Sequence, residues 1–142
     1  MQSVTLSNGV KMPVIGYGTL QITDPAQCRQ CVGNALACGY RLVDTAAAYG
    51  NERAVGDAIK TCGVPREELF IITKLWVQDA GYDNTLKAFE TSRKNLGLDY
   101  IDLYLIHQPF GDYYGAWRAM ENCMPVARCV PLGLATSLQS AW

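Results

Sequence analysis

The sequence predicts an α/β fold built around a parallel sheet, and three observations support this prediction. Short apolar runs, which are typical of strands, alternate with longer stretches that have the composition of helices. Glycine directly follows several of these longer stretches, and glycine is the residue that most often ends a helix. The strand segments are apolar on both faces, which is typical of parallel strands that helices cover.

A hairpin and a buried strand are expected at the start of the chain. Apolar and polar residues alternate in 4–6 and 10–12, and between them lies Asn8-Gly9, a pair typical of tight hairpin turns. The apolar run 14–19 contains two glycines near its end. It is therefore predicted to be a strand that leads into a tight loop.

Helices and strands then alternate along the chain. The first helix is predicted to begin at Asp24 and Pro25, which suit the N-cap and the first turn, and to end near Cys38. Asn51 is expected to cap the second helix in the same way. Further strands are expected at residues 41–44, 69–75 and 101–106, and further helices at 51–62, 83–96 and 111–121.

Two folds contain this alternation, an open doubly wound sheet and a (β/α)8 barrel. The loop from Gly16 to Gln21 lacks the third glycine of the dinucleotide-binding G-x-G-x-x-G sequence, which argues against the doubly wound sheet. A complete barrel takes about 250 residues, whereas this chain has 142. We therefore predict the N-terminal half of a (β/α)8 TIM barrel, preceded by the hairpin and truncated after about four βα units.

Composition excludes several classes of partner and location. The formal net charge is −1 and no basic stripe is present, so nucleic acid is not an expected partner. No apolar run reaches the length of a membrane span, and residues 1–11 lack the pattern of a signal peptide. We therefore expect a cytoplasmic protein with no membrane contact, in which the cysteines remain thiols.

Cys28 and Cys31 form a C-x-x-C pair, a spacing that binds metals or performs redox chemistry in some proteins. Here the pair lies within a predicted helix, and the chain has only one histidine to complete a metal site. We therefore interpret the cysteines as small packing residues and expect no bound metal. A regulatory thiol or metal protein that uses Cys28, Cys31, Cys38 and Cys62 is the least favoured alternative.

Polar side chains follow three of the predicted strands. Asp44 ends the second strand with Tyr49 just beyond it, Lys74 lies near the end of the third, and His107 follows the fourth. In a barrel these strand ends converge on one site. A lysine ammonium stabilises a nearby phenolate, an aspartate keeps that lysine charged, and a histidine can donate a hydrogen bond to a carbonyl oxygen. The four residues therefore predict a proton-transfer centre, to which a cofactor would have to supply hydride.

Several stretches, in one order and spacing, together resemble a single enzyme family. They are Gly16-Tyr17-Gly18-Thr19, GYRLVDTA at 39–46, YGNE at 49–52, ITKLW at 72–76 and DLYLIHQP at 102–109. From about Val4 to Glu121 the chain resembles the aldo-keto reductases. Within that family it is most similar to the bacterial branch that includes 2,5-diketogluconate reductases.

The resemblance implies the NADPH-dependent reduction of aldehydes and ketones to alcohols, with a small-molecule carbonyl compound as substrate. It implies a catalytic tetrad of Asp44, Tyr49, Lys74 and His107. Tyr49 would be the general acid, and Lys74, paired with Asp44, would make it more acidic. His107 would orient the substrate carbonyl.

The resemblance also implies contacts with the cofactor and the substrate. The residues expected at the cofactor are Gly18, Thr19, Leu20 and Asp44, the last of them at the nicotinamide ribose. The residues expected at the substrate are Tyr17, Trp76 and His107, with the two aromatic residues forming part of an apolar wall.

The resemblance ends after Glu121. We expect residues 1–122 to form a partial aldo-keto reductase domain and 123–142 to be an unrelated, poorly ordered tail. Our hypothesis is a frameshift after Asn122, because a one-nucleotide shift with permitted codon choices turns the tail into a sequence containing the family-like GKVRAIGVGNF. Sequencing the DNA across this junction tests the hypothesis, which an intact single frame encoding an unrelated tail would contradict.

A half-barrel would lack the later strands of the sheet. We expect open edges at the first and fourth strands, and we expect the remaining cofactor contacts to be missing. Because positioning supplies much of an enzyme's rate, the isolated chain is expected to have little or no activity. The alternative is a non-catalytic half-barrel that self-associates through its open edges.

Overall fold

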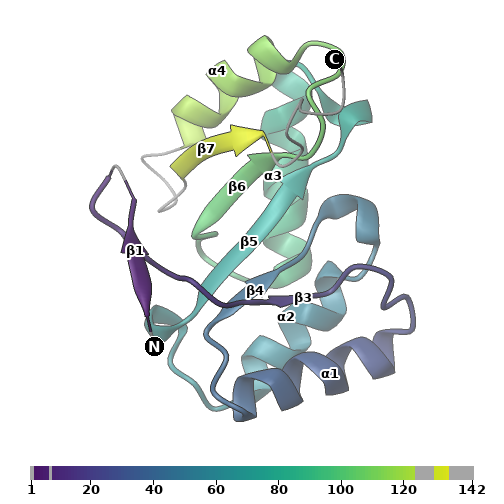
Figure 1. Ribbon diagram of the computed structural model, residues 1–142. Helices are drawn as coiled ribbons and strands as arrows, with labels where there is room; N and C mark the ends of the chain where they lie inside the picture. Colours follow the sequence, from purple (N-terminus) through teal and green to yellow (C-terminus); the bar gives the residue numbers. More distant parts are fainter. Residues whose placement is uncertain (1, 7, 124–129, 135–142) are drawn as a thin grey trace, which may run out of the picture.

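The computed structural model describes residues 2–6, 8–123 and 130–134 (Figure 1). Most of the tail predicted at 123–142 lies outside these residues. The prediction that this tail is poorly ordered therefore also concerns residues outside the described part of the chain. In chain order the elements are β1 (Ser3–Thr5), β2 (Lys11–Pro13), β3 (Tyr17–Gly18), α1 (Pro25–Ala37), β4 (Leu42–Asp44), η1 (Ala47–Tyr49), α2 (Glu52–Thr61), η2 (Arg66–Glu68), β5 (Phe70–Leu75), η3 (Val77–Asp79), α3 (Tyr82–Leu96), β6 (Leu103–Ile106), α4 (Tyr113–Cys123) and β7 (Val130–Leu134).

The described strands form one parallel sheet and one antiparallel hairpin. The sheet has the order β3-β4-β5-β6-β7, and a helix separates each of its strands from the next. The strands β1 and β2 form the hairpin, which lies on the opposite side of the sheet from α1 and α2 (Figure 1). The predicted α/β class and the predicted N-terminal hairpin are therefore confirmed.

Alternate residues of the strands face two different apolar clusters. Val43 and Ile71 point to the helices, where both are fully buried. The opposite face holds strand residues that pack with apolar side chains from the hairpin region, namely Leu42, Phe70, Ile72 and Leu103 with Leu6, Val10 and Met12. Because Leu42 and Phe70 begin their strands, the hairpin covers the amino ends of the sheet.

The local signals for the helix ends operate as predicted at α1 and α3. The Asp24 carboxylate accepts a hydrogen bond from the Gln27 N–H at 2.7 Å and so caps α1. Gly97 ends α3 in the left-handed conformation, with φ of 64°. Asn51 precedes α2 as predicted, but its side chain makes no capping hydrogen bond, so that part of the prediction is wrong.

The expectation of an open edge at the fourth strand is also wrong. Strand β7 pairs with β6 in parallel, with Val130 opposite Leu103. Pro131 is the second residue of β7, and a proline within a short apolar run argues against a strand when only the sequence is considered. Strand β7 is the outermost of the described sheet, where a proline is tolerated because the missing N–H need not face a partner.

A partly buried ion pair joins the segments that lead into β5 and β6. The Arg66 guanidinium donates to the Asp102 carboxylate at 2.5 Å and to the Tyr100 carbonyl at 3.0 Å. The same carboxylate oxygen accepts the Ile71 N–H at 2.9 Å, and the Asp102 side chain is only 6% exposed. This carboxylate therefore joins η2, β5 and the start of β6 at the amino end of the sheet.

Gly56 allows α2 to lie directly against the end of α3. A Cβ atom at this position would lie 2.2 Å from the Leu96 carbonyl oxygen, so Gly56→Ala must push the two helices apart. We expect the free energy of unfolding to fall by about 1–3 kcal/mol, as for other overpacked cores. Urea denaturation followed by circular dichroism measures this loss.

The matched control for that substitution is Gly33→Ala in α1, where an added Cβ meets nothing within 4 Å. This variant should gain about 0.5–1 kcal/mol, because alanine is the better helix former. Opposite signs for the two glycines are the expected result. An equal gain in stability from both would contradict the close packing of α2 on α3.

Candidate active site

Strand register places Asp44 and Lys74 on the same face of the sheet at its carboxyl end. Asp44 ends β4 opposite Ile72, and Lys74 lies two residues beyond Ile72 on β5. Ile72 belongs to the apolar cluster on the face away from the helices. Since side chains two residues apart share a face, the aspartate and the lysine converge there, beyond the apolar cluster.

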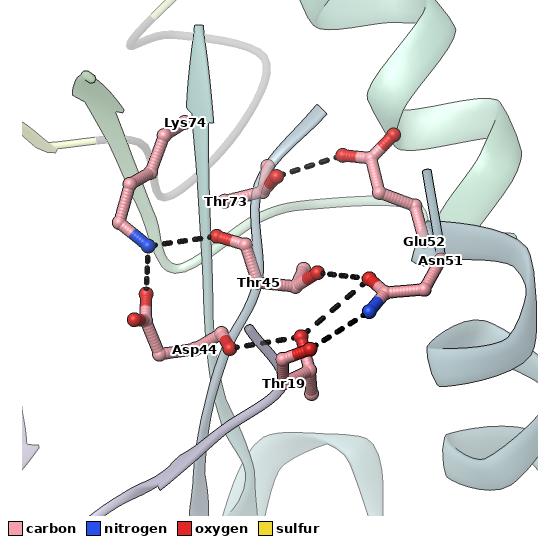
Figure 2. A network of polar contacts seen from close by, with 7 residues as sticks. All are labelled: Thr19, Asp44, Thr45, Asn51, Glu52, Thr73 and Lys74. Carbon is pink, nitrogen blue, oxygen red and sulfur yellow. Dashed lines mark hydrogen bonds and ion pairs between the residues drawn. The ribbon is translucent and has the colours of Figure 1, made fainter. Parts of the chain in front are cut away.

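Lys74 is a buried cation with two oxygen partners. Its side chain is 7% exposed, and its Nζ donates to the Asp44 carboxylate at 2.5 Å and to the Thr45 carbonyl at 2.9 Å (Figure 2). A buried ammonium is costly unless it is paired and hydrogen-bonded, and these two contacts satisfy that requirement. The Asp44 side chain is 35% exposed, so part of the carboxylate stays accessible from solvent.

A cluster of three rings begins at the charged end of Lys74. Tyr49 ends the short helix η1, and Gly50 follows it in the left-handed conformation, which turns the chain into α2. The Lys74 Nζ lies 5.2 Å from the centre of the Tyr49 ring. The His107 ring meets Tyr49 edge-on at 5.7 Å and Trp76 at 5.3 Å, as distances between ring centres. The structure therefore brings together Asp44, Tyr49, Lys74, His107 and Trp76, five of the residues singled out from the sequence.

The environment of His107 favours its neutral form. Burial lowers the pKa of His107 from its ordinary value of 6.5, and the charge of Lys74 lowers it further, while Asp44 acts in the opposite direction. Tyr49 and Trp76 supply the ring contacts around it. A neutral imidazole can donate one hydrogen bond, but it is a weak source of protons at pH 7.

His107 is the only histidine of the chain, so its titration can be followed by NMR without assignment. We expect its pKa to lie below 6.5, to rise in Lys74→Met, and to fall further in Asp44→Asn. Because the folded pKa is the lower one, the stabilising contribution is fully present above pH 6.5. It is lost as the pH falls through the folded pKa. Shifts of the same sign in both variants would contradict the arrangement of charges around His107.

The expected cofactor residues differ in how accessible they are. Gly18 is exposed, and a side chain added there would meet nothing within 4 Å. Leu20 is 61% exposed, whereas Thr19 is completely buried. The Thr19 N–H and hydroxyl both bond to the Asp44 carbonyl, at 3.0 and 3.2 Å. Thr19 therefore supports the loop from within, and only Gly18 and Leu20 of this loop offer an open surface.

Tyr17 does not join the group around His107. It pairs with Val43 in the sheet and so points to the helix side, where its ring meets Tyr40 edge-on at 6.1 Å. Burial and the neighbouring Cys31 thiol raise the pKa of Tyr17, in keeping with its position against α1. The expectation that Tyr17 forms the substrate wall overlooked strand alternation, which places Gly18 rather than Tyr17 on the face of Asp44.

Asn51 was predicted only as a helix cap, but it connects two loops at the site. Its Nδ2 donates to the Thr19 carbonyl at 2.9 Å, and its Oδ1 accepts the Thr45 hydroxyl at 2.8 Å (Figure 2). The Nδ2 also donates to the Ile22 carbonyl at 3.1 Å. The next residue, Glu52, accepts the Thr73 hydroxyl at 2.7 Å. In the sequence, an asparagine before a helix is compatible with capping the helix and with joining two loops. No local signal distinguishes these two roles.

Among the described residues, no cysteine belongs to the group around Lys74. Cys28, Cys31, Cys38 and Cys62 are free thiols, and burial raises the pKa of Cys28. Across residues 2–6, 8–123 and 130–134, His, Cys, Asp and Glu side chains form no cluster that could hold a metal ion. No helix in this part of the chain is long and apolar enough to cross a membrane.

A groove of about 790 Å³ lies between α2 and α3, and none of the four predicted catalytic residues lines it.

Comparison with known proteins links this arrangement to one family. The sequence model described as "Aldo/keto reductase family" matches residues 14–134, beyond the boundary predicted at residue 122. The chain is 46% identical over 134 residues to a glyoxal reductase of Bacillus subtilis, covering 94% of the chain and 49% of that protein. It is also 46% identical over 133 residues to a 9,11-endoperoxide prostaglandin H2 reductase of Trypanosoma cruzi, covering 93% and 47%. The chain thus spans about half the length of the curated relatives it matches.

Solved structures agree with the sequence comparisons. An aldo/keto reductase from Brucella melitensis superposes with a TM-score of 0.86 at 45% identity, over 90% of this chain and 51% of that one. The aldo-keto reductase of Bombyx mori in complex with NADP superposes with a TM-score of 0.82 at 36% identity, over 89% and 48%. The open parallel sheet and its helices therefore match about half of each of these larger chains.

Proposed function

The chain belongs to the aldo/keto reductase family, and on that premise we propose that its site serves the NADPH-dependent reduction of an aldehyde or ketone to an alcohol. The main support is the contact between Lys74, Asp44 and Tyr49. The buried Lys74 ammonium is held by Asp44 and lies 5.2 Å from the centre of the Tyr49 ring, where a positive charge can stabilise a phenolate after proton donation.

Each of the four residues has a distinct part in the proposed reaction. Tyr49 donates its hydroxyl proton to the carbonyl oxygen, and the Lys74 charge stabilises the phenolate that remains. The Asp44 carboxylate accepts a hydrogen bond from the Lys74 ammonium and holds it in place. Burial and the charge of Lys74 lower the pKa of His107 and so favour the neutral imidazole, which orients the carbonyl through a hydrogen bond and leaves the proton transfer to Tyr49. When bound, NADPH supplies the hydride to the carbonyl carbon.

The residues of this chain fit part of a nicotinamide site. The Asp44 carboxylate is 35% exposed beside Tyr49, so it is available to a ribose hydroxyl. Gly18 and Leu20 offer an open surface on the neighbouring loop, whereas Thr19 is enclosed and acts only as support. We therefore assign cofactor contacts to Asp44, Gly18 and Leu20, and we expect the affinity for NADPH to be low. The narrower similarity to 2,5-diketogluconate reductases stays a prediction.

Titration of the chain with NADPH, followed by protein fluorescence, tests this proposal. We expect saturable binding, and we expect Gly18→Leu to weaken it at least tenfold, a loss of about 1.4 kcal/mol. The variant should fold, because nothing lies within 4 Å of a Cβ added at Gly18. The leucine side chain would, however, occupy the open surface beside Asp44. Gly33→Leu, at an equally open glycine of α1, is the control and should bind as the unchanged chain does.

Two results would count against the proposal. Absence of binding up to millimolar NADPH would mean that the four residues do not take part in carbonyl reduction in this chain. Equal affinity in Gly18→Leu would mean that the cofactor does not lie against this loop.

A self-associating, non-catalytic half-barrel is the second candidate. Val14 and Ile15 are 55% and 62% exposed next to β3, the edge strand at the other end of the described sheet. Exposed apolar residues beside an unpaired strand edge favour pairing with a second copy. A molecular mass in solution that rises with concentration, without NADPH binding, would favour this candidate.

A further inference from the structure

Asn51 lies at the centre of a buried polar network that links the loops around the site. The residue is 4% exposed and comes directly before α2. Figure 2 shows its amide pointing away from the helix, toward Thr19 and Thr45. The two Nδ2 hydrogens are used by the Thr19 and Ile22 carbonyls, and Oδ1 accepts the Thr45 hydroxyl. A fourth, longer contact runs from the Thr19 hydroxyl to Oδ1 at 3.5 Å.

Both loops that the amide holds are in contact with the Lys74–Asp44 pair. The Thr45 carbonyl accepts a hydrogen bond from the Lys74 Nζ at 2.9 Å. Thr45 is thus hydrogen-bonded to Asn51 through its side chain and to Lys74 through its backbone. The Thr19 N–H bonds to the Asp44 carbonyl at 3.0 Å. The Asn51 amide is therefore linked to each partner of the ion pair through one intervening residue, Thr45 for Lys74 and Thr19 for Asp44.

We propose that Asn51 is a positioning residue, whose amide holds Thr45 so that the Thr45 carbonyl and the Asp44 carboxylate together fix the Lys74 ammonium. This inference rests on the proposed function, in which Lys74 activates Tyr49. Asn51 itself contacts neither Lys74 nor Tyr49 in the contacts described above. Its effect on the reaction passes through Thr45.

Only a side chain with both donors and an acceptor meets the demands of this position. An aspartate would keep the acceptor for Thr45 but would face the Thr19 and Ile22 carbonyls with negative charge. A leucine or an alanine would leave two carbonyls and one hydroxyl without this partner in a buried position, which is costly. These hydrogen bonds therefore explain an asparagine at position 51, which helix capping does not.

Chemical labelling of Lys74 tests the inference without cofactor or substrate. The chain is acetylated briefly under native conditions, and mass spectrometry compares Lys74 with Lys87, an exposed lysine of α3. In the unchanged chain Lys74 should be strongly protected. In Asn51→Ala we expect its labelling relative to Lys87 to rise about three- to tenfold, the factor that corresponds to one net hydrogen bond.

Two variants at Thr45 examine the same contact from its other side. Thr45→Val removes the hydroxyl that bonds to Asn51 and should expose Lys74 to a similar degree as Asn51→Ala, while Thr45→Ser should restore the protection. The double variant Asn51→Ala, Thr45→Val should label no more than either single variant, because the residues are coupled. The Thr45 pair keeps the test decisive if Asn51→Ala fails to fold.

Gly56→Ala separates positioning from general destabilisation. It is expected to lower stability between α2 and α3, where its Cβ would meet Leu96, and it should leave the ratio of Lys74 to Lys87 labelling unchanged. The titration of His107 gives a second readout, which should move in Asn51→Ala in the same direction as in Lys74→Met.

The outcomes distinguish this inference from the proposed function. If Lys74→Met shifts the His107 titration, but Asn51→Ala and Thr45→Val change neither labelling nor titration, the positioning role is refuted and the proposed site stands. If Lys74→Met leaves the His107 titration unchanged, the proposed site itself is refuted. Raised labelling of Lys74 in Gly56→Ala as well would also overturn the inference, because general loosening would then explain the effect.

Discussion

Asp102→Ala should lower the free energy of unfolding by about 3–5 kcal/mol, the usual loss when one partner of a buried ion pair is removed. The carboxylate is 6% exposed, and one of its oxygens accepts from both the Arg66 guanidinium and the Ile71 N–H. We expect the lower end of this range, because Arg66 is 21% exposed and keeps the Leu69 and Tyr100 carbonyls as partners. Since small domains have about 5–15 kcal/mol in total, the loss would be large for this chain.

Urea denaturation measures this loss, and Asp99→Ala is the matched control. Asp99 is an exposed aspartate three positions earlier in the chain, so the control removes the same charge and should change stability by less than about 0.5 kcal/mol. Adding Arg66→Met to Asp102→Ala should recover part of the loss, since the unpaired cation is then removed too. Equal stability of the two aspartate variants would contradict a structural role for the ion pair.

The order of the elements could be predicted from the sequence because their signals are local. Asp24-Pro25 and Gly97 mark helix ends through the conformations that these residues favour, and the structure places α1 and α3 accordingly. Strand β7 was missed because residues 123–142 were interpreted as a frameshifted tail unrelated to the family. The proline of β7 is acceptable because this strand lies at the edge of the described sheet.

The grouping of Asp44, Tyr49, Lys74 and His107 could also be predicted, because parallel strands bring their carboxyl ends to one edge. What could not be read from the motifs was the direction of each side chain. Tyr17 and Gly18 are adjacent in a glycine-rich motif, yet the register with β4 turns one toward the helices and the other toward the site. Strand alternation is the signal that would have corrected this assignment.

Long-range polar contacts lay beyond what the sequence could show. Asn51 meets Thr19 across 32 positions and Asp102 meets Arg66 across 36, so no short pattern links these residues. Both contacts satisfy buried groups that only the folded chain brings together. The residues that hold the site in place were therefore harder to predict than the residues that carry the proposed chemistry.

Tyr49→Phe should reduce carbonyl reduction by about 10²–10⁴-fold, the usual contribution of a positioned general acid. The substitution removes only the hydroxyl, and the ring contacts with His107 and with the Lys74 ammonium can persist. NADPH affinity should consequently stay within about twofold of that of the unchanged chain, since the loss falls on the transition state rather than on binding. This separation of rate from affinity is what identifies a proton donor.

Because the chain is expected to turn over slowly, the assay should count product directly. Glyoxal is incubated with NADPH that carries deuterium at the transferable position, and mass spectrometry measures deuterium in the alcohol. Tyr40→Phe, on the helix side against Tyr17, is the matched control and should keep the rate of the unchanged chain. Equal deuterium transfer by Tyr49→Phe and the unchanged chain would remove Tyr49 from the proposed mechanism. If neither the unchanged chain nor Tyr40→Phe transfers deuterium while both bind NADPH, the four residues are assembled but insufficient, and the reaction requires groups beyond those described in this chain.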